Sequence, residues 1–130
     1  MRKHLEDERG ASAVEFALVL PILIVLVLGI IEFGHAFQVQ GTLSAAAREG
    51  ARAMALRNSQ DEAKDAVRAA AAALDPAITD DQISMRPAMC PAGTSTTNVT
   101  LTIEYPKPFL TGFFGASIDL TGTGVMRCQG

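Results

Sequence analysis

Residues 16–31 read FALVLPILIVLVLGII, a run of sixteen residues without a charge, bounded by Glu15 and Glu32. Extending the run to residue 37 reaches the roughly 20 residues that a helix needs to cross a bilayer. The alternative is a buried core helix, but the rest of a 130-residue chain can hardly surround a helix that is apolar on every side. The sequence therefore predicts a transmembrane helix over about residues 16–37.

Three residues inside or just after this run modify the predicted helix. Pro21 removes one backbone hydrogen bond, which predicts a kink or a break near the preceding turn. Gly29 and Gly34 would let a neighbouring helix approach closely, as small residues do in membranes. All three are compatible with a helix in lipid.

The composition and the motifs exclude several classes of protein. A length of 130 residues leaves room for one small domain, and 11 Lys and Arg against 14 Asp and Glu give a net charge of −3. This charge argues against a nucleic-acid partner. The sequence has no nucleotide-binding loop, zinc-ligand spacing or nucleophile elbow, and His4 and His35 lie far apart. We expect no catalytic residue, no cofactor and no metal site.

Helical signals continue after the apolar run. Residues 38–58 are rich in alanine, and if they continue the first helix, residues 11–57 form a rod of about 70 Å. A capping-box signature from Ser59 to Glu62 and acidic residues in the following turn predict a second helix over residues 60–74. Its narrow apolar face consists of Ala63, Val67, Ala70 and Leu74.

The rest of the chain alternates apolar and polar residues with a period of two. This pattern predicts a strand over residues 99–105, ended by Pro106 and Pro108, a second over residues 118–126 and a short third over residues 83–86. The expected fold is α+β, with a long N-terminal transmembrane helix, a second short helix and a small antiparallel sheet of about three strands.

The two cysteines, Cys90 and Cys128, lie in the downstream region. They are either two free thiols or a disulfide, and a disulfide would be stable only in an oxidising compartment such as the periplasm. If it forms, it closes a loop of roughly 40 residues and contributes about 3–4 kcal/mol to stability.

The segment at the start of the apolar run resembles a known processing signal. Gly10 is followed by four small or apolar residues, Glu15 and Phe16, an order that resembles the type IV prepilin cleavage motif. Over about residues 9–57, and more weakly over 118–127, the chain is similar to the TadE-like pseudopilins of tight-adherence (Flp) pilus systems. Three blocks carry the similarity: RGASAVEFALVLP (9–21), GIIEFG (29–34) and AAAREGAR (45–52).

The resemblance implies a processing step and an assembly contact. Prepilin peptidase would cut after Gly10, so that the mature chain begins at Ala11. Glu15, followed by Phe16 in the same motif, would then pair with the α-amino group of Ala11 in an adjoining subunit. Such pairing offsets the desolvation of both charges in low dielectric.

The resemblance also implies a topology and a set of partners. Residues 1–10 would be a cytoplasmic leader, residues 11–57 the transmembrane and stem helix, and residues 58–130 an exported α+β domain. The chain would cross the bacterial inner membrane once, with its N-terminus in the cytoplasm. Its partners would be prepilin peptidase, other pilins and pseudopilins, the inner-membrane assembly platform and the lipid bilayer.

Two further stretches have two readings each. Arg48, Glu49 and Arg52 form either a solvated helix face, with Glu49 placed to pair with Arg52, or a contact with a neighbouring subunit. The loop over residues 107–115 is unusually apolar, and forms either a lid over the sheet or a contact with lipid or another pilus component. Its large apolar residues are Phe109, Leu110, Phe113 and Phe114.

Two other functions compete with a pseudopilin that assists pilus assembly or initiation. One is a secreted binding domain released by signal peptidase after Ala36, and the other is an uncleaved single-pass scaffold of the envelope. The three hypotheses predict different first residues for the natural product, namely Ala11, Phe37 and Met1.

Overall fold

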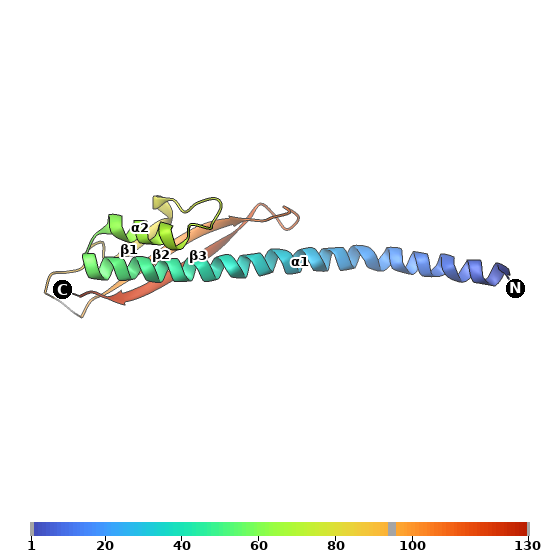
Figure 1. Ribbon diagram of the computed structural model, residues 1–130, viewed down its shortest axis with the longest axis horizontal. Helices are drawn as coiled ribbons and strands as arrows, with labels where there is room; N and C mark the ends of the chain where they lie inside the picture. The colour runs from blue at the N-terminus through green and yellow to red at the C-terminus, as the bar shows by residue number, and fades with distance from the viewer. Residues whose placement is uncertain (1, 94–95, 130) are drawn as a thin grey trace. The chain divides into compact units, whose positions relative to one another are not determined.

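The computed structural model describes residues 2–93 and 96–129, and their side chains from residue 8 onward. The chain divides into two compact units, Met1–His35 and Ala36–Gly130. The expected α+β fold is confirmed (Figure 1). The elements in chain order are the helices α1 (Arg2–Arg57) and α2 (Gln60–Ala70), the 3-10 helix η1 (Asp80–Gln82) and the strands β1 (Ile83–Arg86), β2 (Asn98–Pro108) and β3 (Ser117–Arg127).

The first unit is the N-terminal part of α1, and it is apolar and exposed. Every side chain of residues 8–27 is exposed, the bulky apolar ones included. This part of α1 is long and apolar enough to cross a membrane. The helix runs through Pro21 without interruption, so of the predicted kink or break the break does not occur. A proline removes only one backbone donor, which a long helix can lose without ending.

The second unit packs the C-terminal part of α1, with α2, against the sheet. The sheet has the order β1-β2-β3 and both pairings are antiparallel, with Ile83 opposite Ile103 and Leu101 opposite Gly124. The predicted alternation in β2 is confirmed, because one face of this strand is buried. The buried residues of that face are Val99, Leu101, Ile103, Tyr105 and Lys107.

Three glycines bring the layers of this unit unusually close together. A Cβ atom on Gly50 of α1 would lie 2.5 Å from Val67 of α2 and 2.6 Å from Leu101 of β2. A Cβ on Gly122 of β3 would lie 2.6 Å from the backbone of Leu43, and one on Gly124 would collide with the backbone of Ala47. The packing of α1 on β3 therefore depends on the absence of side chains at these positions.

The second helix is shorter than predicted. It ends at Ala70 rather than at residue 74, because Ala71 leaves helical geometry (φ −111°, ψ 24°) while its N–H still bonds to Val67. The core-facing residues are Ala63, Val67 and Ala71, whereas Ala70 is exposed. A run of alanines carries no stop signal, so the predicted end lay near residue 74, shortly before Pro76.

The prediction that the second strand ends at Pro106 is wrong, because β2 continues through Pro106 and ends at Pro108. The N–H of Phe109 donates to Ala116 and that of Cys128 to Thr97, so odd-numbered positions of β2 bond to β3. The two prolines therefore point to the other edge, which β1 leaves open because its pairing ends opposite Ile103. Proline is tolerated on such an unpaired edge.

The loop that joins β2 to β3 does not cover the sheet. Leu110, Phe113 and Phe114 are exposed, and Phe109 is half-buried. The prediction of a lid is therefore wrong. The two strands stay paired up to Pro108 and Ser117, and the loop that joins them lies beyond the end of the sheet (Figure 1).

Candidate processing and assembly site

The residues of the predicted cleavage motif lie on one exposed stretch of α1 in the first unit. Gly10, Ala11, Glu15 and Phe16 are all helical and exposed. Ala11 and Glu15 are four residues apart, so they lie on the same side of the helix, about 6 Å apart along its axis. Within the described part of the chain, no hydrogen bond or ion pair joins Glu15 to another side chain.

Gly10 has no packing role within the chain. A Cβ added at Gly10 would meet nothing within 4 Å, in contrast with Gly50, Gly122 and Gly124. Glycine costs about 1 kcal/mol relative to alanine inside a helix. Packing among the described residues therefore does not require a glycine at this position.

A groove between α1 and α2 holds part of the predicted subunit contact. Its volume is about 470 Å³, and α1 supplies Glu49, Arg52 and the exposed Leu56 to its wall. Arg48 is exposed but lies outside the groove, and its backbone N–H faces Gly124. No ion pair joins Glu49 to Arg52 among the described side chains, so the structure gathers these two residues without pairing them.

The sequence reasoning missed the α2 wall of this groove. This wall consists of Glu62, Asp65, Ala66 and Ala69. Arg57 also lines the groove and pairs with Glu62 at 2.6 Å. The groove thus has an apolar floor between charges of both signs. The repeat of small residues on the side of α2 away from Val67 was the available signal.

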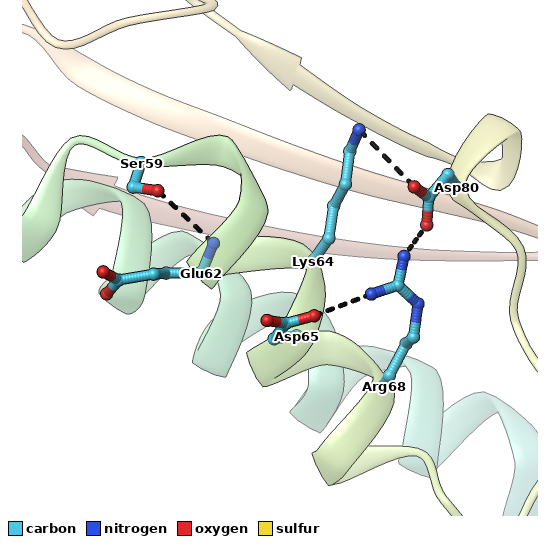
Figure 2. Close-up of polar contacts among 6 residues, drawn as sticks. All are labelled: Ser59, Glu62, Lys64, Asp65, Arg68 and Asp80. Carbon is cyan, nitrogen blue, oxygen red and sulfur yellow. Dashed lines mark hydrogen bonds and ion pairs between the residues drawn. The ribbon is translucent and has the colours of Figure 1, made fainter.

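The side of α2 that faces η1 carries a separate polar cluster (Figure 2). Arg68 pairs with Asp65 at 2.8 Å and also with Asp80 of η1, while Lys64 lies 4.0 Å from the same carboxylate. At the start of the helix, the Ser59 hydroxyl accepts the N–H of Glu62 at 3.4 Å, as the capping signature predicted. The contacts of Arg68 and Lys64 with Asp80 join α2 to the chain that follows it, and these three residues do not line the groove, whereas Asp65 does.

The disulfide is formed, and it is coupled to the end of α1. Cys90 and Cys128 are joined, with a sequence separation of 38. Asn58, at a positive φ of 50°, ends α1 and clamps Cys90 from both sides: its Oδ1 accepts the Cys90 N–H at 2.7 Å, and its Nδ2 donates to the Cys90 carbonyl at 3.2 Å. Sequence reasoning missed Asn58, although asparagine is a known helix-ending residue.

No cluster of three or more His, Cys, Asp and Glu side chains that could hold a metal occurs among the residues whose side chains the structure describes.

One buried polar group, the Tyr105 hydroxyl, has a shifted pKa. Burial, and next the charge of Asp75, raise the pKa of Tyr105, whose hydroxyl donates to the Pro76 carbonyl at 2.7 Å. This hydrogen bond joins the segment at Pro76 to β2.

Comparison with known proteins identifies one segment of the chain. A family model described as TadE-like protein matches residues 10–52. No curated protein and no solved structure matches. The matched segment runs from Gly10 through the apolar helix to Arg52. The resemblance predicted from the three sequence blocks is therefore confirmed, and the chain is TadE-like over residues 10–52.

Proposed function

We propose that this protein is a membrane-anchored minor pseudopilin that acts in the assembly or initiation of a tight-adherence pilus. Its role is structural rather than catalytic. The observation that carries the proposal is a TadE-like segment that begins at Gly10 and continues into an exposed apolar helix. The disulfide supports an exported second unit, because such bonds persist in oxidising compartments.

Cleavage after Gly10 by prepilin peptidase is the first step of the proposal. The peptide bond between Gly10 and Ala11 lies within α1, whereas a peptidase requires an accessible, locally unwound backbone. Glycine lowers the helix propensity there by about 1 kcal/mol. Because nothing packs against this position, unwinding it breaks no side-chain contact of Gly10.

Pairing between Glu15 and a new amine is the second step. A carboxylate next to the apolar run costs about 2–3 kcal/mol in lipid, and an opposite charge offsets that cost. After cleavage, the amine of Ala11 is the first group of the helix, one turn before Glu15 on the same side. A neighbouring subunit displaced by one turn brings its amine to this carboxylate, so the same spacing repeats along an assembly.

The exposed face formed by Arg48, Glu49 and Arg52 is proposed as a further subunit contact. The groove supports this role for Glu49 and Arg52, because its apolar floor with charges of both signs suits a helix of a neighbouring subunit. Arg48 flanks the groove on α1.

The intact mass of the chain extracted from its natural membrane tests the cleavage step. We expect a mature product of 120 residues that starts at Ala11, since 130 − 10 = 120. Gly10→Val should retain the leader, whereas Gly41→Ala, a change at another open glycine, should be processed normally. A start at Phe37 would show a secreted domain, and a start at Met1 an uncleaved scaffold; either contradicts the proposal.

The role of Glu15 needs a separate experiment. Glu15→Gln keeps the shape of the side chain and removes its charge, so it should be inserted and cleaved but lost from purified pilus assemblies. Glu104→Gln, at an exposed position on β2, is the control and should be recovered normally. Full recovery of the Glu15→Gln chain in the assemblies would contradict the pairing.

A further inference from the structure

The loop between β2 and β3 presents a cluster of exposed apolar side chains. From residue 108 to residue 118 the chain has no charge, between Lys107 and Asp119. Leu110 is 58% exposed, Phe113 64% and Phe114 40%. The rings of Phe113 and Phe114 meet edge to face with their centroids 5.5 Å apart, and Phe109 lies 6.3 Å from Phe114. Exposed apolar clusters of this kind mark interaction surfaces.

The direction of β3 places this loop at one particular end of the second unit. The Gln40 side-chain amide donates to the Thr121 carbonyl at 2.7 Å, and Gly122 lies against Leu43. Further along, the N–H of Gln129 bonds to the carbonyl of Ala55 at 3.3 Å. The strand β3 therefore runs in the same direction as α1, and the loop that precedes it lies at the Ala36 end of the unit (Figure 1).

The loop also extends far enough to reach the start of this unit. Gln40 and Thr121 lie side by side, so both lengths are counted from this contact. Back to residue 116 the strand covers about 16 Å, whereas back to Ala36 the helix covers only about 6 Å, so the strand reaches past Ala36. Ala36 is the residue at which the apolar segment joins the second unit, and the predicted membrane span ends at about residue 37. The bilayer surface therefore lies at the end of the unit that carries the loop.

We propose that the β2–β3 loop is a second membrane contact, which inserts Leu110, Phe113 and Phe114 into the interface of the leaflet on the side of the folded domain. The inference rests on the proposed membrane anchor and adds a contact outside the TadE-like segment. A single helix leaves a domain free to rotate and tilt on its anchor. A second contact, at the end of a hairpin that packs rigidly on α1, fixes the orientation of the domain relative to the bilayer.

The chain offers a direct fluorescence test, because it contains no tryptophan. Phe113→Trp places a single indole in the loop. Met89→Trp is the matched control, since Met89 has the same 64% exposure. It lies at the opposite end of the unit, where its neighbour Cys90 is clamped by Asn58 at the end of α1. Both full-length chains are reconstituted in phosphatidylcholine vesicles with either ordinary or brominated acyl chains.

We expect brominated lipid to remove roughly half of the Phe113→Trp emission, because indole settles at the membrane interface. In ordinary vesicles, the emission maximum of this chain should lie at a shorter wavelength than that of an indole in water. The Met89→Trp emission should change in neither respect. Leu110→Trp provides a second position in the loop and should behave as Phe113→Trp does. Far-ultraviolet circular dichroism checks that each chain is folded.

The possible outcomes separate this inference from the proposed anchor. If a chain that floats with the vesicles shows no quenching at Phe113→Trp and Leu110→Trp, the loop contact is wrong and the anchor stands. A short-wavelength maximum without quenching would mean that the loop is buried against protein, in its own chain or in a second copy, and also overturns the lipid contact. If brominated lipid quenches Met89→Trp as strongly as Phe113→Trp, the quenching is not specific to the loop and the inference is wrong. A chain that fails to float overturns both proposals.

Discussion

The two parts of α1 follow opposite rules of composition, although they belong to one helix. In the first unit the helix presents large apolar side chains, such as Leu18, Leu23 and Leu26, and they are exposed. In the second unit its core face consists largely of alanines that are fully buried, Ala46, Ala47 and Ala51 among them. Lipid chains adapt to bulky side chains, whereas a sheet has a fixed backbone that approaches closely only where side chains are small.

This difference suggests that the two units depend on different sources of stability. The first needs a hydrocarbon environment and little internal packing. The second buries modest side chains and gains from close backbone approach at Gly50, Gly122 and Gly124, and from the bond between Cys90 and Cys128. Changes in the second unit should therefore unfold it without affecting the membrane helix.

Removal of the disulfide gives the largest expected effect. In the double variant Cys90→Ala with Cys128→Ala, the free energy of unfolding of the second unit should fall by about 3–4 kcal/mol, because the closed loop no longer restricts the unfolded chain. Tyr105, the single tyrosine and a core residue, reports unfolding by its fluorescence in denaturant titrations of the chain in detergent micelles.

The same double variant should retain the circular dichroism of the apolar helix and its insertion into vesicles. Wild-type protein treated with a reductant is the control and should match the variant. A loss of insertion together with the loss of folding would show that the two parts of α1 are not energetically independent.

Glycine substitutions sharpen the contrast within the second unit. Gly124→Val places a branched side chain against the backbone of Ala47, which cannot rotate away, and should destabilise the unit by about 2–3 kcal/mol. Gly41→Ala, on α1 where a Cβ meets nothing within 4 Å, should stabilise the helix by about 0.5–1 kcal/mol. Equal effects at the two positions would contradict the close-packing interpretation.

Tyr105 gives a smaller effect with a distinct pH dependence. Tyr105→Phe removes the hydrogen bond to the Pro76 carbonyl, for a loss of about 1 kcal/mol. In the wild type the pKa of this phenol is raised above its ordinary value of about 10, by burial and then by the charge of Asp75. Its stabilising contribution is therefore complete below pH 10, and it declines as the pH rises toward the pKa of the folded state.

Thermal unfolding followed by circular dichroism between pH 8 and about pH 11 tests this dependence. The wild type should lose stability above about pH 10, and the part of that loss due to Tyr105 should be absent in Tyr105→Phe. Parallel pH curves for the two chains would show that another group causes the alkaline decline.

Local signals in the sequence predicted the parts of the fold that local chemistry controls. The uncharged run of residues 16–31 indicated the membrane helix, and the period-two pattern indicated the buried face of β2. The end of α2 was missed because alanines continue past it, and the extension of β2 through its prolines was missed because it depends on which edge β1 leaves open. The second of these depends on contacts between distant segments.

The candidate site divides in the same way. The motif around Gly10 and Glu15 is contiguous, so the sequence alone could predict it, and both residues lie within the TadE-like segment of residues 10–52. The α2 wall of the groove, Asn58 and the position of the β2–β3 loop depend on how α1, α2 and the sheet pack together. No spacing within the sequence encodes that arrangement directly.

Removal of a charge between α2 and η1 should have the smallest effect on the free energy of unfolding. Its size measures how much of the stability of the second unit is electrostatic. Asp80→Asn weakens the pairs with Lys64 and Arg68 and should cost about 0.2–1 kcal/mol, because Asp80 is 57% exposed and water screens its charge. The cost should nearly vanish in about 1 M salt, where the Debye length is about 3 Å. Asp81→Asn, at the next exposed carboxylate, is the control and should have no effect. A loss well above 1 kcal/mol that persists in salt would mean that this cluster is desolvated, and that the second unit depends on charge pairing as well as on close packing.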